Sequence, residues 1–137
     1  MKEKTTSATG QTPPASQNGT SKYFKPEDFR CRCGCGLNNI SPELVAILDK
    51  VRETAGIALR ITSGSRCAKH NEAVGGESDS AHLTGLAADI AIASSHERYL
   101  VSKAAIAVGV DRMGIGINLV HLDIDRDKSK EVAWLYA

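Results

Sequence analysis

The sequence has no large excess of charge of either sign, few aromatic residues and no long apolar run. Lys and Arg number 17 against 16 Asp and Glu, so the net charge of +1 gives no electrostatic signal toward nucleic acid or an anionic membrane. Aromatic residues make up only 4% of the chain, and a core must therefore be built mostly from Ile, Leu, Val and Ala. No segment approaches the roughly 20 apolar residues needed to cross a bilayer. We expect neither a nucleic-acid partner nor a membrane span.

The amino-terminal stretch lacks both an apolar signal segment and the side chains that build a core. Residues 1–21 are rich in Ser, Thr, Gln, Gly and Pro, so they cannot offset the entropy of ordering, and we expect a flexible tail. Residues 22–137 are too few for two separate cores and predict one domain. Without a secretory signal, the protein is expected to stay in the cytoplasm as synthesised unless something releases it. No heptad repeat or long apolar surface stretch is present, and we expect a monomer.

The pattern of apolar residues predicts two helices and several short strands. The first helix begins after Ser41, an N-cap, and ends at Gly56, and a second lies within residues 94–110. A long polar loop, with at most one helical turn, separates the first two strands. Strands are predicted in residues 58–64, 87–92, 112–118, 119–125 and 131–136, the last three joined by tight turns. This order predicts an α+β fold with a small, mainly antiparallel sheet and packed helices.

Two of the four histidines have a carboxylate at a defined offset. His82 precedes Asp89 by seven residues, and His121 precedes Asp123 by two, so that on a strand the latter pair points to one face. The other histidines have more ordinary surroundings. His96 is expected at the solvated start of a helix, and His70 in a loop or short helix.

His82, Asp89 and His121 together meet the needs of a hydrolytic zinc site. Such a site takes three nitrogen or oxygen ligands and leaves one position open for water. A charged Asp89 on a half-buried strand is costly unless it is paired or binds a cation. The alternative is that Asp89 pairs with an arginine such as Arg60 or Arg66, and that His121 is an ordinary strand histidine.

Four segments in series resemble peptidase family M15, the zinc D-Ala-D-Ala carboxypeptidases, particularly its small subgroup of bacterial and phage proteins. They are an S-G-S-R turn at 63–66, N-x-x-V-G-G at 71–76, S-x-H-x-x-G-x-A-x-D at 80–89, and a final G-I-G with H-x-D at 114–123. The likeness extends over residues 24–136, nearly all of the part expected to fold.

The resemblance implies a fold like that of hedgehog and D-Ala-D-Ala peptidases, with zinc bound by His82, Asp89 and His121. It implies that Arg66 faces a carboxylate or carbonyl of the substrate, and that Ser80 hydrogen-bonds the substrate or a ligand. The implied reaction is attack by a metal-activated water on a D-amino-acid-containing peptide bond of a peptidoglycan stem peptide. The enzyme would act as a carboxypeptidase or an endopeptidase after release to the cell wall.

The general base of the best-known family members is missing from this sequence. They carry Asp or Glu three residues before the last histidine ligand, where this chain has Asn118. We nominate Asp123 as the catalytic base or, alternatively, as the partner that orients His121. The missing base also leaves open a catalytically weak or inactive peptide-binding or assembly module, in a phage tail or associated with the envelope, on the same fold.

Three cysteines alternate at positions 31, 33 and 35, and Cys67 follows Arg66. The C-x-C-x-C spacing lacks the two-residue spacer of ordinary zinc knuckles, although a four-cysteine zinc site stays open. A disulfide to Cys67 could form after release to an oxidising exterior, and a nucleophilic Cys67 is a further alternative. We favour a structural role in which Cys31, Cys33 and Cys35 fasten their loop beside the site.

Overall fold

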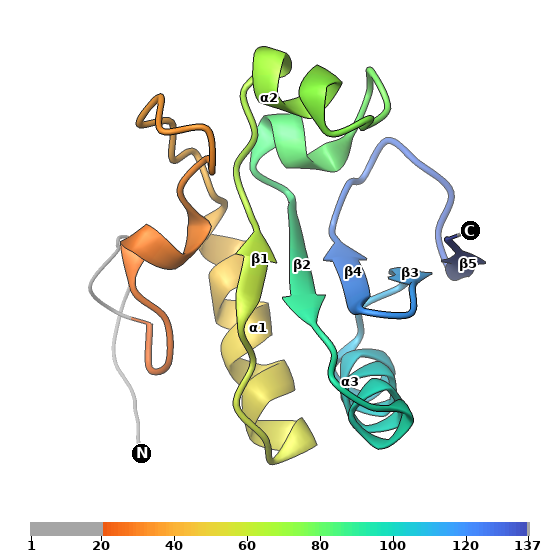
Figure 1. The fold of residues 1–137 in the computed structure, drawn as a ribbon. Coiled ribbons are helices and arrows are strands. Elements are labelled where there is room, and N and C mark those ends of the chain that lie inside the picture. The colour runs from red at the N-terminus through yellow and green to blue at the C-terminus, as the bar shows by residue number, and fades with distance from the viewer. Residues whose placement is uncertain (1–20, 137) are drawn as a thin grey trace.

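The computed structural model of the protein describes residues 21–136, which form a mixed α+β fold around one five-stranded sheet (Figure 1). The predicted tail, residues 1–21, lies outside the described residues except for Ser21. The described elements, in chain order, are η3 (Pro26–Phe29), α1 (Pro42–Ala55), β1 (Ile61–Ser63), α2 (Ala68–Ala73), η4 (Ala81–Thr84), β2 (Ala87–Ala91), α3 (Ser95–Val108), β3 (Arg112–Ile115), β4 (Leu119–Asp123) and β5 (Val132–Leu135), where η marks a 3-10 helix.

The two long helices begin and end where the sequence predicts. The Ser41 side chain accepts an N–H of the first turn of α1, and Gly56 ends that helix with a positive φ of 74°. In the same way, Ser94 caps α3 and Gly109, with φ of 106°, ends it. Within residues 21–136, neither of these helices nor any other is long and apolar enough to cross a bilayer.

The sheet has the strand order β1-β2-β4-β3-β5, and each neighbouring pair is antiparallel except β3 with β5. This confirms the predicted small and mainly antiparallel sheet. Alternate residues of β2 and β4 point to opposite faces. Those on one face are fully buried against the helices: Ala88, Ile90, Val120 and Leu122 from the strands, with Leu44, Leu48 and Val51 from α1 and Val101 and Ala105 from α3. The other face carries Asp89, His121 and Asp123.

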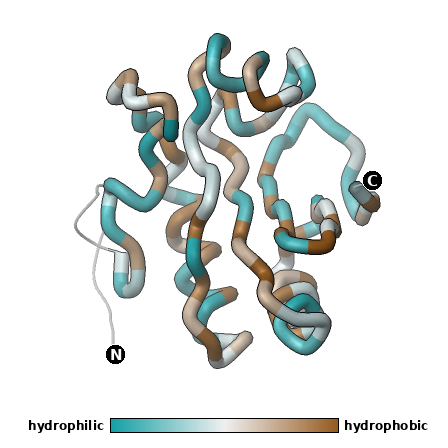
Figure 2. Tube along the Cα trace, in the orientation of Figure 1, coloured by the Kyte–Doolittle hydropathy of each residue, from teal (hydrophilic) through white to brown (hydrophobic). Residues whose placement is uncertain are grey.

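The last strand does not follow β4 through a tight turn, and that part of the sequence prediction is wrong. Both edges of β4 are already occupied, by β2 and by β3, so β5 takes the free edge of β3 and runs parallel to it. Figure 2 shows the connection between β4 and β5, residues 124–131, as an almost unbroken hydrophilic segment. This crossing brings the end of the chain back to the face that carries His121.

The polar loop between β1 and β2 contains two short helices, α2 and η4, where the sequence predicts at most one helical turn. η4 ends at Gly85, whose φ is 74°. The Gly85 carbonyl accepts the N–H of Ser41 at 2.8 Å, and a Cβ at Gly85 would collide with the carbonyl oxygen of Asn39. The segment that carries His82 is therefore seated on the loop before α1.

Exchanging Gly85 for alanine tests this seating against a matched glycine. Gly56 has the same φ of 74°, but a Cβ there would meet no atom within 4 Å. We expect Gly56→Ala to lower the free energy of unfolding by about 1–2 kcal/mol through backbone strain alone. Gly85→Ala should cost about 1–3 kcal/mol more because Asn39 must move. Urea unfolding of both variants measures the difference, and equal losses would contradict the close approach.

Candidate metal centre

The register of β2 and β4 places Asp89 directly opposite His121. His121 and Asp123 lie two residues apart on β4, so both side chains project to the same face as Asp89, away from the helices. All three residues are buried, and the Asp123 side chain is only 2% exposed. The sheet itself thus gathers two carboxylates and one imidazole into a small, largely dry volume.

His82 reaches the same volume from η4. The Ser80 hydroxyl accepts the backbone N–H of His82 and caps this short helix. The buried ring places Nδ1 2.7 Å from the carbonyl oxygen of Gly64, to which it donates, and this leaves the Nε2 lone pair free. His82 Nε2 lies 3.3 Å from Asp89 Oδ1.

His121 lies between two carboxylates. Its Nδ1 is 2.9 Å from Asp89 Oδ1, and its Nε2 is 2.8 Å from Asp123 Oδ2. The His82 and His121 rings meet edge to face, with centroids 5.1 Å apart. When Nε2 donates to Asp123, Nδ1 is the nitrogen that can present a lone pair toward Asp89.

The three donor atoms fit a zinc ion. His82, Asp89 and His121 each offer one ligand atom, and these atoms all lie within 4.8 Å of one another, in a set of two imidazoles and one carboxylate. Tetrahedral zinc, with bonds of about 2.0–2.1 Å, separates its ligand atoms by about 3.3 Å, close to the 3.3 and 2.9 Å found here. The other nitrogen of each imidazole meets a protein acceptor, as in zinc sites whose histidines are held by outer partners.

The hydrogen bonds and charges within this cluster lower the pKa of Asp89 and raise the pKa of His121. Burial alone would raise the pKa of Asp89, but the hydrogen bonds and charges of His121 and His82 bring it well below its usual value. Burial alone would lower the pKa of His121, yet its hydrogen bonds to Asp123 and Asp89 raise it. Both carboxylates therefore favour the form of His121 that carries a proton on each nitrogen.

Asp123 uses both carboxylate oxygens within the protein. Oδ2 accepts from His121, while Oδ1 lies 2.6 Å from Arg112 Nε and 3.1 Å from the backbone nitrogen of Asp125. Although burial opposes ionisation, these donors lower the pKa of Asp123. A carboxylate held in this way is suited to fixing the orientation of an imidazole.

Arg66 lies beside the cluster and contacts Asp89 from the other side. Its Nη2 is 3.4 Å from Asp89 Oδ2, its Nη1 donates to Asn71 Oδ1 at 2.9 Å, and its side chain is 12% exposed. A Cβ at Gly76 would collide with Asn71 Oδ1, so glycine lets this loop close over the arginine. The ion pair between Asp89 and an arginine, which was the alternative interpretation, is thus present together with the histidine cluster. Arg66 contacts Oδ2 of Asp89, and the two histidines contact Oδ1.

Arg66, His82, Asp89, His121 and Asp123 line one open cleft of about 690 Å³. The cleft also has an aromatic wall that sequence reasoning missed, formed by Trp134 of β5 and by Tyr136. The Trp134 ring lies 5.4 Å from the His121 ring, and Gly114 leaves room for it because a Cβ there would meet Trp134 and Tyr136. The sequence signal that could have revealed this wall was the pair of aromatic residues, Trp134 and Tyr136, separated by one residue.

Asn118 lies in the exposed turn between β3 and β4 and is not among the residues that line the cleft. Two carboxylates at the rim do line it, Glu77 and Asp79, and both are exposed. Sequence reasoning did not single them out, because they lie in the loop before His82 with no spacing that marks a catalytic role.

A sequence model of the peptidase M15 family matches residues 22–125. The chain belongs to the M15 peptidase family. The match includes His82, Asp89 and His121 and confirms the resemblance; it ends before the aromatic wall of the cleft. No curated protein matches the chain. In this M15 family member, the segments that carry the resemblance converge on the cleft.

Metal binding by this M15 family member should strengthen as pH rises, because zinc must displace the proton on His121 Nδ1. We expect affinity to gain about tenfold per pH unit and to level off above the usual imidazole value of about 6.5, since Asp123 and Asp89 raise the pKa of His121. In Asp123→Asn, the pH above which zinc affinity stops rising should be lower. Competition titrations with a chelator measure the affinity, and His82→Ala shows how much zinc binds elsewhere. The same limiting pH in Asp123→Asn and in the wild type would contradict the role of His121 Nδ1 as a ligand.

Proposed function

We propose that the chain is a zinc-dependent peptidase of the bacterial cell wall that hydrolyses D-amino-acid-containing bonds in peptidoglycan stem peptides. One observation carries the proposal: His82 Nε2, Asp89 Oδ1 and His121 Nδ1 converge at the floor of an open cleft. In each imidazole, the nitrogen turned away from the cluster is bonded to a protein acceptor. A zinc ion held by these three residues would supply Lewis acidity toward the scissile carbonyl and would lower the pKa of a water.

The residues around the cluster would bind and orient the peptide. Arg66 can turn its guanidinium between Asp89 and an incoming carboxylate or carbonyl, for which its forked donors are suited. Arg112 and Lys128 also line the cleft, where they are paired with Asp123 and Asp125. Trp134 and Tyr136 would pack against the peptide and exclude bulk water from it.

We assign Asp123 to the positioning of His121. A general base must reach the reacting water, whereas both oxygens of Asp123 are engaged and its side chain is 2% exposed. Glu77 and Asp79 are the exposed carboxylates of the cleft lining and are our candidates for the proton acceptor. Ser80 would support His82 through the N–H that it accepts.

The second candidate function is a peptide-binding or assembly module without catalysis. The observation that favours it is the exposed position of Asn118 outside the cleft, combined with the full pairing of Asp123. Among the described residues, the carboxylates left to serve as base therefore lie only at the solvent-exposed rim. Such a protein would keep its metal and its cleft but release no product.

Hydrolysis of purified stem peptides, followed by mass spectrometry, separates the two functions. With zinc present we expect the wild type to release a new product. His82→Ala should lose about 1000-fold or more in kcat/KM, because a metal ligand is removed. The matched control is His96→Ala, since this exposed histidine at the start of α3 lies outside the cleft and its loss should leave the rate unchanged. Binding of stem peptide without any product from the wild type would favour the module.

The roles of the three carboxylates separate when activity is measured at several zinc concentrations. Asp123→Asn should weaken zinc binding by about 10–100-fold, and saturating zinc should restore most of kcat. Removing the proton acceptor should lower kcat by about 100-fold or more at any zinc concentration. We expect Glu77→Gln or Asp79→Asn to behave in the second way. An irrecoverable loss in Asp123→Asn, with both rim variants active, would instead make Asp123 the base.

A further inference from the structure

We propose that Cys31, Cys33, Cys35 and Cys67 form a second metal site, a tetrathiolate site for Zn²⁺ with a structural role. It is separate from the histidine cluster and uses no residue of it. The proposal does not rest on the peptidase function, because a structural zinc site needs only four convergent thiolates.

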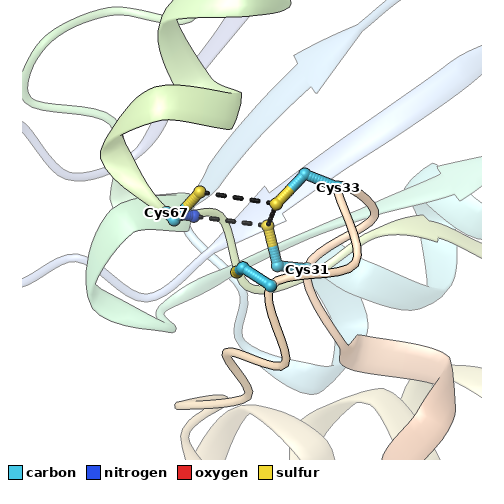
Figure 3. Close-up of side chains that lie close together, drawn as sticks. Cys31, Cys33 and Cys67 are labelled. Carbon is cyan, nitrogen blue, oxygen red and sulfur yellow. Dashed lines mark hydrogen bonds between the residues drawn. The ribbon is translucent and has the colours of Figure 1, made fainter.

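The four sulfurs converge as ligands of one ion would. Their Sγ atoms lie within 4.8 Å of one another. Figure 3 shows Cys33 pointing toward both Cys31 and Cys67, at sulfur separations of 3.5 and 3.6 Å. Zinc–sulfur bonds of about 2.3 Å in a tetrahedron place neighbouring sulfurs about 3.8 Å apart. All four cysteines are free, and the separations match sulfurs grouped around an ion rather than a covalent pair.

Two glycines explain how a C-x-C-x-C run can fold around an ion without the usual two-residue spacer. Gly34 and Gly36 have φ of 88° and 89°, a conformation that other residues rarely adopt. The loop is closed by a hydrogen bond from the Cys31 N–H to the Leu37 carbonyl, at 2.9 Å. The chain thus turns after each of the last two cysteines instead of running on as an extended strand.

Backbone N–H groups point at three of the sulfurs. Cys31 Sγ accepts from Cys67 N at 3.4 Å, Cys67 Sγ from His70 N at 3.3 Å, and Cys35 Sγ from Leu37 N at 3.5 Å. Such bonds favour the thiolate over the thiol, and thiolates are the form that binds metal. Soft sulfur ligands in a tetrahedral set select zinc over magnesium or calcium.

The alternatives account for less of this arrangement. A single disulfide between Cys33 and Cys67 would leave two sulfurs of the group, and their N–H donors, without a role. A nucleophilic Cys67 needs a base, whereas its sulfur faces Cys33 and the N–H of His70. An ion bound by all four sulfurs accounts both for their convergence and for the N–H groups that point at them.

The consequence is a link between two distant segments at the edge of the cleft. Cys67 directly follows Arg66, so an ion here would tie the loop of residues 31–37 to the turn that carries the cleft arginine. A metal that binds only the folded arrangement stabilises it, in the same sense as a crosslink between these segments. The site would therefore hold Arg66 in place without touching the substrate.

Zinc content of protein purified under reducing conditions tests the proposal, with Cys33→Ser and Cys35→Ser as variants because both side chains are exposed. We expect about two zinc ions per chain in the wild type, and about one each in His82→Ala and in the cysteine variants. About one ion in the wild type, lost in His82→Ala and kept in the cysteine variants, would overturn the tetrathiolate site and leave the peptidase proposal intact. One ion kept in His82→Ala but lost in the cysteine variants would support the tetrathiolate site while the histidine site failed.

Cobalt substitution gives a readout that does not depend on the folding of a cysteine variant. Cobalt-loaded His82→Ala, whose four cysteines are intact, should show the near-ultraviolet charge-transfer absorption of thiolate–cobalt bonds. Its thermal midpoint should fall when a chelator removes the ion. Absence of that absorption would overturn the proposal.

Discussion

The antiparallel pairing of β2 with β4, in the register that sets Asp89 opposite His121, is the constraint on which the rest of the site depends. A slip of one residue would move these side chains onto the helix-covered face and place Ala88 or Leu122 in the cleft. The fully buried apolar residues on that other face make such a slip costly, so the hydrophobic core specifies the position of the polar cluster. The same register places the Asp123 side chain on the cleft face, because Asp123 lies two residues beyond His121 on β4.

A charged cluster on a nearly dry sheet face is costly unless each charge is paired. Removing one ion from water costs several kcal/mol even after relaxation, so unpaired groups would oppose folding. Here Asp89 is shared between the histidines and Arg66, while Asp123 is shared between His121 and Arg112. The pairing fixes the two imidazole rings and turns one nitrogen of each toward Asp89, and that nitrogen would be a metal ligand once it has lost its proton. Stability and the geometry suited to a metal thus come from the same contacts.

The sequence predicted the long helices and the sheet type because caps and apolar periodicity are local signals. It also brought His82, Asp89 and His121 into one hypothesis, since a strand at Asp89 and another at His121 can share a face. It could not choose between the two roles of Asp123, because that depends on Arg112 arriving from β3. It missed Trp134 and Tyr136 because β5 crosses to the far edge of β3, a choice set by which sheet edges remain free. The sequence left the metal and disulfide alternatives for the cysteines open, because spacing alone does not reveal the positive φ of Gly34 and Gly36.

We propose that two imidazoles and one carboxylate, each presenting a specific atom, hold zinc at the floor of the cleft. X-ray diffraction from crystals grown with zinc, measured on both sides of the zinc absorption edge, locates the ion. We expect an anomalous peak bonded to His82 Nε2, Asp89 Oδ1 and His121 Nδ1 at about 2.0–2.2 Å. His121 Nε2 should remain hydrogen-bonded to Asp123. A zinc-loaded crystal with no peak at this position, or with His121 bound through Nε2, would rule out this ligand set.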